Sequence, residues 1–332
     1  MKLILFKIFN FLGIYVENLH SPNIFLYSLR KMPLNIKQYE IKKKTNYAAI
    51  VDNHKYYNDL LKEDIENWNI EVQKPIFIGK GIGASSLDTF RRVSIDGKLY
   101  FEKVYFNSFP ELENVLWFQE NYYEDVVKSI RTAKIEKVYK GKIMSVIYYE
   151  FLELNPLSSE SVEDSIIQIS KKLYKLSKNQ LSVQNHIIDF KKHFEYKRNI
   201  DSLTEDYSKI GIFVKKFEVL AESSSQILTH GDIQKTNIFQ DMTLVDWDSV
   251  GFYPIGLEQA LIYYRFLFED LACDLPLNWL LNSFKDVVAD EDWLDFERNF
   301  VFFLSVFASN LFKENKKLNV HLIVTDYLKE YN

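Results

Sequence analysis

The pattern of apolar and polar positions changes character several times along the 332-residue chain. From residue 75 to about 106, short β-rich runs alternate with turn signals, and Asp96-Gly97 is a strong hairpin signal. A helix is predicted over 110–127, where Pro110 follows a Ser-Phe entry. Two further strand patterns follow, at 133–141 and 142–152. This order of elements predicts a small α+β lobe.

Beyond Leu154 the helical period dominates. In SVEDSIIQISKKLYKLSKN the apolar residues recur on one helical face, at Val162, Ile166, Ile169 and Leu173. A charge-rich stretch over about 186–224 also predicts helix, and helices are expected again from about 255 to the end. The run NFVFFLSVFASNLF, of 14 residues, predicts a buried core helix. It is shorter than the roughly 20 residues that a membrane-spanning helix needs.

The first 72 residues are predicted to form a mainly helical N-terminal extension. Its first segment, MKLILFKIFNFLGIYVENLH, resembles a membrane segment, but Lys7 and Asn10 interrupt the apolar run. No small-x-small cleavage site follows it, which disfavours a signal peptide. Two interpretations stay open: a helix that packs on the body of the protein, or peripheral membrane contact through residues 1–16.

Composition narrows the class of function. The chain is 47% hydrophobic and 26% charged, which is ordinary for a folded globular protein. The net charge is -5 and no long Lys/Arg stripe is present, so nucleic-acid binding is disfavoured. The one cysteine, Cys273, excludes an internal disulfide framework and fits a reducing compartment, which predicts a cytoplasmic location.

The stretch LTHGDIQKTNIFQDMTLVDWDS places two acids and an amide in an apolar context. Buried carboxylates are costly unless they are paired, hydrogen-bonded or bound to a metal. Asp232 is suited to accept a proton from an attacking hydroxyl. Asn237 and Asp246 offer oxygen ligands to a hard cation such as Mg²⁺. His230 is expected to support this loop rather than to react.

The stretch GKGIGASS lies between two predicted strands and contains Gly81, Gly83 and Ser85. Glycines allow a close backbone approach to phosphates, although an ordinary Gly-rich hairpin is the simpler interpretation when the stretch is taken alone. Lys103 follows on the strand KLYFEKVYF, where alternation places it on the same face as Phe101 and Tyr105. A phosphate or carboxylate partner would explain a lysine on this aromatic face. The alternative is a lysine at the edge of the sheet whose ammonium reaches solvent.

These signals occur in one order: Gly-rich hairpin, strand lysine, helix glutamate, Asp-x4-Asn and a strand-end aspartate. That order matches the parts needed for phosphoryl transfer. HGDIQKTNIF followed by LVDWDSVG resembles the aminoglycoside phosphotransferase and choline kinase family, whose His-Gly-Asp-x4-Asn motif is specific. The resemblance covers roughly residues 75–315.

The resemblance implies a bilobal, protein-kinase-like α+β fold that binds ATP and Mg²⁺ in the cleft. It implies a catalytic base at Asp232, Mg²⁺ ligands at Asn237 and Asp246, and an α/β-phosphate clamp at Lys103. Three domains are expected: an extension over 1–72, a nucleotide-binding N-lobe over 73–153, and a catalytic and acceptor-binding C-lobe over 154–332.

The remaining nucleotide contacts are also implied by the resemblance. The Gly-rich hairpin with Gly81, Gly83 and Ser85 would cover the phosphates. A helix glutamate would orient the clamp lysine; Glu113 is favoured, and Glu111 is the close alternative. Backbone atoms near Glu150 and Leu152 would pair with adenine.

The sequence departs from the family in GFYPIGLEQA. Pro254 and Glu258 stand where family members commonly carry two aspartates that are thought to brace the catalytic loop. This departure motivates an alternative function, a pseudokinase that binds nucleotide or a protein partner without turnover. Protein kinase activity is disfavoured because the chain lacks His-Arg-Asp, Asp-Phe-Gly and Ala-Pro-Glu motifs.

The acceptor is expected to be a small-molecule alcohol: an aminoglycoside, choline or another amino alcohol, or a sugar or glycan. The acidic runs FEDLACDLP and DVVADEDWLDFE would favour a cationic acceptor. Solvated helix faces explain them more simply. The oligomeric state, and the choice between ATP and GTP, have no signal in the sequence.

Overall fold

The computed structural model describes the placement of the following residues: 14–15, 30–31, 70–72, 77–78, 89–106, 110–140, 144–158, 162–180, 187–192, 201, 207–268, 277–309 and 324–325. The predicted helical extension and the segment 1–16 lie outside them, apart from three short strands. These are β1 (Ile14–Tyr15), β2 (Arg30–Lys31) and β3 (Ile70–Val72).

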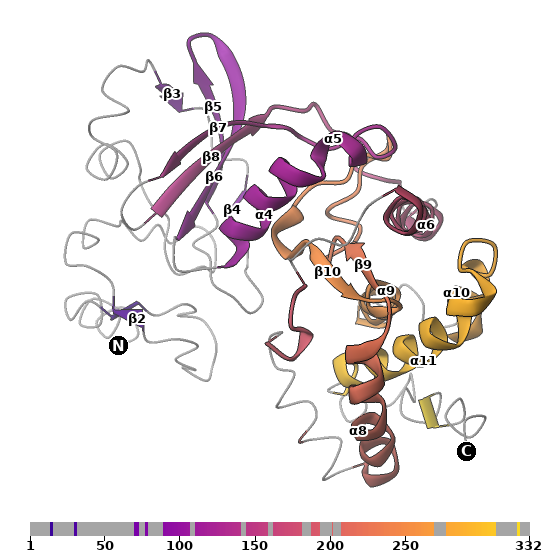
Figure 1. Ribbon diagram of the computed structural model, residues 1–332. Coiled ribbons are helices and arrows are strands. Elements are labelled where there is room, and N and C mark those ends of the chain that lie inside the picture. Colours follow the sequence, from indigo (N-terminus) through magenta and orange to yellow (C-terminus); the bar gives the residue numbers. More distant parts are fainter. Residues whose placement is uncertain are drawn as a thin grey trace. The chain divides into compact units, whose positions relative to one another are not determined.

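The chain forms two compact units. Unit 1 comprises residues 1–113 and 133–153, and unit 2 comprises 114–132 and 154–332. Unit 1 contains an antiparallel sheet, whereas helices predominate in unit 2 (Figure 1). The architecture is therefore α+β, with sheet and helices separated between the two units.

The larger sheet of unit 1 has six strands in the order β3-β5-β6-β8-β7, with β4 also paired to β5. The strands after β3 are β4 (Phe77–Ile78), β5 (Thr89–Ile95), β6 (Lys98–Phe106), β7 (Ile135–Lys140) and β8 (Met144–Glu150). Asp96 and Gly97 join β5 to β6 with φ of 51° and 77°. This is the positive-φ pair that a two-residue hairpin requires, so the predicted Asp-Gly turn is confirmed.

Strand β6 is covered on both faces near its centre. Lys103 is 3% exposed and Glu102 is 1% exposed, although consecutive strand residues point to opposite faces. The sequence predicted one half-buried face with Lys103, Phe101 and Tyr105 on it. Both faces are buried at this position, so the lysine lies in an enclosed environment rather than at an open edge.

Unit 2 contains most of the helices. The predicted helix over 110–127 is confirmed, with a break at Tyr122 between α4 (Pro110–Asn121) and α5 (Tyr123–Val126). The other elements of unit 2 are α6 (Val162–Gln180), η3 (Phe190–Lys192), α8 (Ser208–Ser223), β9 (Gln226–Thr229), η4 (Trp247–Ser249), β10 (Gly251–Pro254), α9 (Leu257–Phe268), α10 (Leu277–Ser283) and α11 (Asp290–Phe307).

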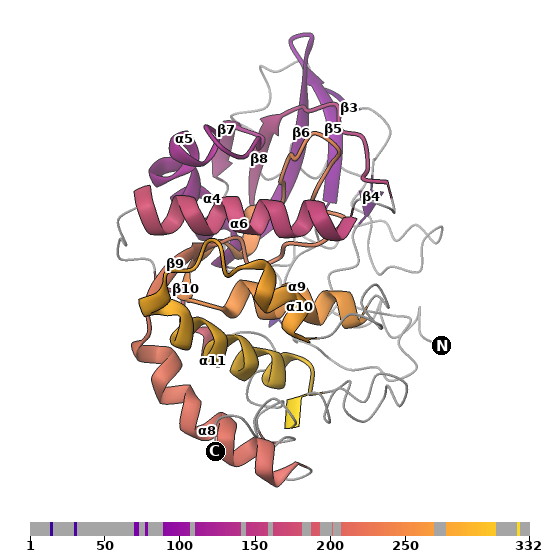
Figure 2. The same cartoon turned by 90° about the vertical axis from the view of Figure 1, so that its right-hand side faces the viewer.

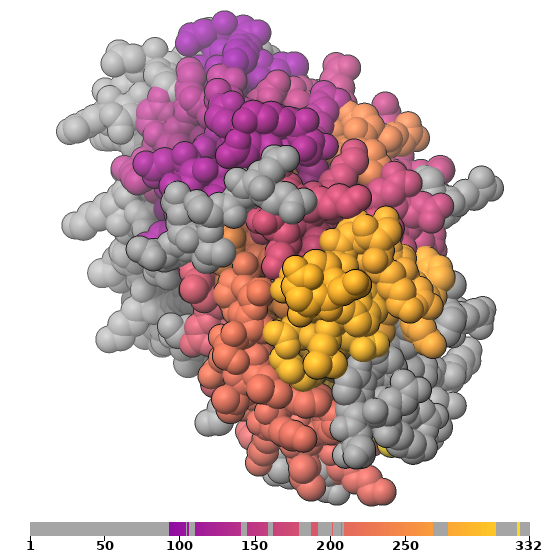
Figure 3. Space-filling view, turned by 45° about the vertical axis from the view of Figure 1, so that its right-hand side comes forward, coloured from indigo at the N-terminus to yellow at the C-terminus, as the bar shows by residue number. Residues whose placement is uncertain are grey.

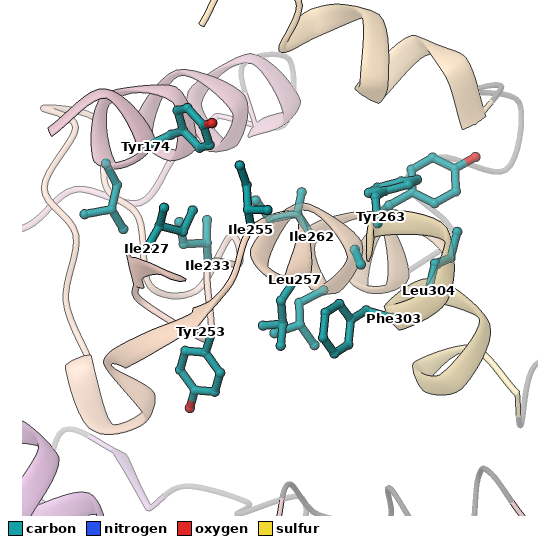
Figure 4. Packing of buried hydrophobic residues seen from close by; sticks show 14 of the residues in the cluster. Tyr174, Ile227, Ile233, Tyr253, Ile255, Leu257, Ile262, Tyr263, Phe303 and Leu304 are labelled. Carbon is teal, nitrogen blue, oxygen red and sulfur yellow. The ribbon is translucent and has the colours of Figure 1, made fainter. Parts of the chain in front are cut away.

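The core of unit 2 lies between α6, the β9–β10 hairpin, α9 and α11. All four residues of the predicted apolar face of α6 are buried, which confirms the amphipathic pattern. In Figure 2 the helices α6, α9 and α11 follow one another in layers, with α8 beside α11. Figure 4 shows Tyr174 of α6 facing Ile227 and Ile255, while Leu257 and Tyr263 of α9 face α11.

One sequence expectation for unit 2 needs correction. The stretch 186–224 is not one long helix in its described parts: Ile187 bridges to Phe252, the short helix η3 follows, and α8 begins only at Ser208. Pairing with a distant strand outweighs local helix propensity there. The predicted buried core helix is confirmed over Asn299–Phe307, where every residue of α11 is buried. The helix begins earlier than the apolar run, at Asp290, and Figure 3 shows α10 and α11 in yellow beside α8.

None of the helices in the described part of the chain is long and apolar enough to cross a membrane.

Candidate active site

The β9–β10 loop, defined as residues 230–250, joins the two strands of the unit 2 hairpin. Thr229 faces Gly251 across the antiparallel pair, so the loop begins and ends at neighbouring backbone positions. Asp232, Asn237 and Asp246 all lie in this loop. The fold therefore holds the three residues predicted for catalysis and metal binding within one closed segment.

Asp232 is fixed by side-chain donors at both carboxylate oxygens. Its Oδ2 accepts hydrogen bonds from Nε2 of Gln234 at 2.8 Å and from Nδ2 of Asn237 at 3.1 Å. Its Oδ1 accepts from Nη2 of Arg265 in α9 at 2.9 Å. The Asp232 side chain stays 24% exposed, so it is held in one orientation without being closed off from solvent. Three side-chain donors therefore fix the orientation of the carboxylate that the sequence predicted as the proton acceptor.

Asn237 and Asp246 lie next to each other because the loop folds back on itself. The backbone N–H of Val245 donates to the carbonyl of Asn237 at 3.0 Å, and Ile238 forms an antiparallel bridge with Leu244. Asp246 has φ of 69°, a left-handed conformation that is uncommon outside glycine. Its side chain is exposed. Strain of this kind is typical of functional positions.

His230 supports the loop, as expected from the sequence. Its Nε2 donates to the carbonyl of Val245 at 3.0 Å, because a carbonyl only accepts, and its Nδ1 accepts the Asp232 N–H at 3.2 Å. These partners assign the neutral Nε2–H tautomer. Burial lowers the pKa of His230, although Asp232 and Asp246 act in the opposite direction. The histidine therefore ties the start of the loop to Val245, just before Asp246.

Glu258, one of the two positions where the sequence departs from the family pattern, braces the loop from α9. Its Oε1 accepts the N–H of Gly231 at 2.9 Å, and the carboxyl is fully buried. Burial raises the pKa of Glu258 to about 8; hydrogen bonds from the backbone of Gly231 and His230 counteract this shift, and nearby Asp232 adds to it. The carboxyl group of Glu258 therefore supports the start of the loop at Gly231.

Trp247 anchors the far end of the loop. Its ring stacks on Phe118 of α4 with centroids 4.1 Å apart, and its Nε1 donates to Oγ1 of Thr132 at 2.8 Å. The amide of Asn114 donates to the backbone carbonyl of Asp248 at 3.0 Å. All of these residues belong to unit 2. The position of Asp246 is therefore set by aromatic packing on its C-terminal side and by Val245 on its N-terminal side.

The loop offers two oxygen ligands of the kind that Mg²⁺ uses in proteins. Among the described residues, no group of three or more His, Cys, Asp and Glu side chains is arranged to hold a metal. Asn237 turns its Nδ2 toward Asp232, which leaves its Oδ1 with a weak contact at 3.4 Å from Thr236. One amide oxygen and one exposed carboxylate suit Mg²⁺, which keeps several waters and binds substrate phosphates through few protein ligands.

The residues predicted for nucleotide contact lie mostly in unit 1. Lys103 places Nζ 5.0 Å from the ring centre of Tyr105, whose hydroxyl lies 3.0 Å from that of Tyr149. Glu111 and Glu113 lie in the first turn of α4. The choice between them as the partner of Lys103 stays a prediction.

The predicted adenine-pairing segment follows β8. The N–H of Glu150 already donates to the carbonyl of Lys134 at 2.8 Å, and Leu152 lies just beyond the strand. Gly81, Gly83 and Ser85 of the predicted phosphate loop lie outside the described residues.

Two contacts of Asp232 were missed from the sequence. Gln234 lies inside the motif, so a polar residue two positions after the acid was a signal that could have been used. Arg265 gave no signal: it lies 33 positions after Asp232, and only the docking of α9 brings it there. Its spacing of seven from Glu258 places both on one face of α9.

Comparisons with known proteins establish the fold. No family model matches the chain, and no curated protein sequence matches it. A thermostable mutant of aminoglycoside phosphotransferase APH(4)-Ia aligns with a TM-score of 0.51 at 10% identity, over 81% of this chain and 94% of that one. Choline kinase LicA from Streptococcus pneumoniae aligns with a TM-score of 0.48 at 13% identity, over 83% and 97%. The alignment at a TM-score of 0.51 shows that the fold is bilobal and protein-kinase-like, and at 10% identity this likeness establishes the fold alone.

Proposed function

We propose that the protein is a small-molecule kinase, which transfers the γ-phosphoryl group of Mg²⁺-bound ATP to a hydroxyl group. The observation that carries this proposal is the carboxylate of Asp232, which three side-chain donors hold in the same loop as the oxygen ligands Asn237 and Asp246. A rigid acid beside a site suited to Mg²⁺ is the arrangement that phosphoryl transfer needs.

The proposed reaction forms one bond and breaks one. The acceptor oxygen bonds to the γ-phosphorus, while the bond from that phosphorus to the β,γ-bridging oxygen breaks and releases ADP. The hydroxyl proton passes to Asp232 and from there to solvent. Because the transition state of such transfers is loose, the main task of Asp232 is to orient the hydroxyl.

Charge neutralisation would come from the metal and from Lys103. Mg²⁺, when held by Asn237 and Asp246, would neutralise the charge that develops on the phosphate oxygens. Lys103 would clamp the α- and β-phosphates, oriented by Glu113 or Glu111. The burial of Lys103 supports this role, because an enclosed ammonium needs an anionic partner.

The other nucleotide contacts extend the same proposal. The segment with Gly81, Gly83 and Ser85 would cover the phosphates, and backbone atoms near Glu150 and Leu152 would pair with adenine. Residues 73–153 would thus bind the nucleotide, and residues 154–332 would bind the acceptor and carry the base.

Two acids of the run 286–297 form ion pairs within unit 2, which favours the simpler interpretation of a solvated helix face. Asp286 pairs with Lys171 at 2.7 Å, and Asp292 pairs with Lys178 at 2.7 Å. Both lysines lie on α6, so these acids hold α6 to the segment around α11. An alcohol remains the proposed acceptor, and its class is a separate question.

The proposed location is the cytoplasm, and peripheral membrane contact through residues 1–16 stays a hypothesis.

Calorimetry and turnover test the proposal together. A non-hydrolysable ATP analogue is titrated with and without Mg²⁺ into the wild type, Asp246→Ala and Asp232→Ala. We expect Mg²⁺-dependent binding in the wild type, its loss in Asp246→Ala, and its retention in Asp232→Ala. Phosphate transfer to an alcohol panel should fall by about 10²- to 10⁴-fold in Asp232→Ala.

Asp125→Ala is the matched control, because it removes an exposed aspartate whose partner is Lys128. It should behave like the wild type in both measurements. Wild-type turnover in Asp232→Ala would show that the base is assigned wrongly. If no nucleotide binds under any condition, the kinase proposal fails and a partner-binding function takes its place.

A further inference from the structure

The two oxygens of Asp232 are not equivalent. A carboxylate oxygen offers about two lone-pair sites. Oδ2 accepts from Gln234 and Asn237, which fills both of its sites. Within the described residues, the side-chain donor on Oδ1 is Arg265, so that oxygen keeps one site. A hydroxyl that donates to Asp232 therefore arrives at Oδ1.

Arg265 lies beside that remaining site. Its Nη2 is 2.9 Å from Oδ1, and its side chain is 31% exposed. A hydroxyl bound to Oδ1 thus has the guanidinium as its neighbour. The group carried by the next carbon of the acceptor then lies within reach of the other guanidinium N–H groups, which form a planar fork that binds oxygen acceptors.

Helix α9 positions the backbone of Arg265, and the hydrogen bond to Asp232 orients its guanidinium. Glu258, on the same face of the helix, holds the N–H of Gly231, the residue before Asp232. The helix itself is fixed by buried Ile262 and Phe266. Side chains on one face of α9 therefore bind two neighbouring loop residues, Gly231 and Asp232. The second of these contacts places the guanidinium of Arg265 beside Asp232.

We propose that Arg265 selects the acceptor by charge. The structure favours a polyol, a sugar or a sugar acid that carries a neutral or anionic oxygen group next to the attacked hydroxyl. Arg265 is paired with Asp232, so an ammonium group is disfavoured where it contacts the outer N–H groups of the guanidinium rather than the carboxylate, because it then meets a like charge. This inference rests on the proposed function, because it assumes that Asp232 receives the acceptor hydroxyl.

A matched set of three probes tests the selection. Glycerol, glycerate and 3-aminopropane-1,2-diol share the same diol and differ only in the group on the third carbon, which is neutral, anionic or cationic. Each is titrated by NMR into the protein saturated with Mg²⁺ and the non-hydrolysable ATP analogue. In the wild type, glycerate should bind about tenfold more tightly than the amine, the scale of one close charge contact.

Two variants separate charge from shape. In Arg265→Gln the charge is absent, so the preference for glycerate should disappear and the amine should bind at least as well. In Arg265→Lys the charge stays, so the preference should persist even though the fork is lost. The affinity for the ATP analogue, measured in the same samples, should be unchanged in both variants. An unchanged affinity would show that both variants are folded.

The outcomes distinguish this inference from the proposed function. The inference is overturned if the three probes follow the same order in wild type and Arg265→Gln, including the case in which none binds. It is also overturned if the amine binds the wild type best. Absence of nucleotide binding in the wild type would instead refute the kinase function, on which the inference depends.

Discussion

Gly231 holds a position in the β9–β10 loop that no side chain fits. Its φ is +81°, and a Cβ atom built there would lie 2.6 Å from the backbone carbonyl oxygen of Ser249. The left-handed conformation is costly for L-residues, and the contact with Ser249 is with backbone that cannot rotate away. The close approach is what allows the two ends of the loop to pack together around Asp232.

Gly231→Ala should therefore destabilise the protein more than Gly97→Ala. Gly97 is the matched control, since its φ is +77° and a Cβ atom at that position would meet nothing within 4 Å. Denaturant unfolding should show a loss of about 1–2 kcal/mol for Gly97→Ala, from backbone strain alone. Gly231→Ala should lose about 1–3 kcal/mol more, from the clash. Equal losses would mean that the loop relaxes freely.

Helix α9 is the element that organises the site. Glu258 on its first turn accepts the N–H of Gly231, and Arg265 two turns later donates to Asp232. The helix thus supplies a carboxyl group, from Glu258, to the loop backbone. It also supplies a guanidinium, from Arg265, to the side chain of Asp232. Because both groups are fixed on one rigid face, a displacement of α9 would disturb the loop and the base together.

The burial of Glu258 gives a pH dependence with a definite sign. Its pKa is about 8 in the folded protein, against an ordinary value of 4.5. The folded state therefore binds more protons than the unfolded state between these values, and the free energy of unfolding falls as pH rises from about 4.5 to 8. Between pH 4.5 and 8 this proton linkage lowers the free energy of unfolding by at most about 5 kcal/mol, so the stabilisation by neutral Glu258 is complete only below pH 4.5.

Glu258→Gln should remove this dependence while keeping an oxygen acceptor for Gly231. Unfolding free energies measured between pH 6.5 and 8 should fall in the wild type and stay flat in the variant. His230 acts with the opposite sign and mainly at the lower end of this window, because its lowered pKa costs stability as pH falls toward and below 6.5, and it does so equally in both proteins. An equal slope in both proteins would show that Glu258 is ionised throughout.

The whole molecule is built from two units that are not continuous pieces of chain. The chain passes between the units after Glu113, Thr132 and Glu153. Unit 2 therefore contains the segment 114–132 as well as everything after residue 153. Five buried side chains of that segment belong to the unit 2 core: Phe118, Tyr122, Tyr123, Val126 and Ile130.

A fragment of residues 154–332 should accordingly fail to fold cooperatively. Each of the five missing side chains contributes about 1.5–3 kcal/mol through burial, and their sum is comparable to the total stability of a domain. Near-UV circular dichroism and thermal unfolding would detect the loss. As the control, residues 114–132 joined to residue 154 by a short Gly-Ser linker should restore a cooperative transition. A cooperative transition in the shorter fragment would refute this account of the core.

The sequence by itself determined the features that depend on neighbouring residues. The turn at Asp96-Gly97 needs two positive φ angles, which this residue pair adopts readily. Helix α6 follows from the spacing of its apolar residues. The positions of Asp232 and Asn237 follow from a short motif, because five residues of one loop are enough to bring an amide to a carboxylate.

Only the tertiary structure decided what surrounds that motif. The contacts of Glu258 and Arg265 join residues 27 and 33 positions apart, and they depend on how α9 packs rather than on any local preference. The pairing of Ile187 with Phe252 replaced a predicted helix for the same reason. Local patterns constrain backbone angles, whereas long-range contacts depend on the shape of the whole core, and a single sequence carries little direct signal for them.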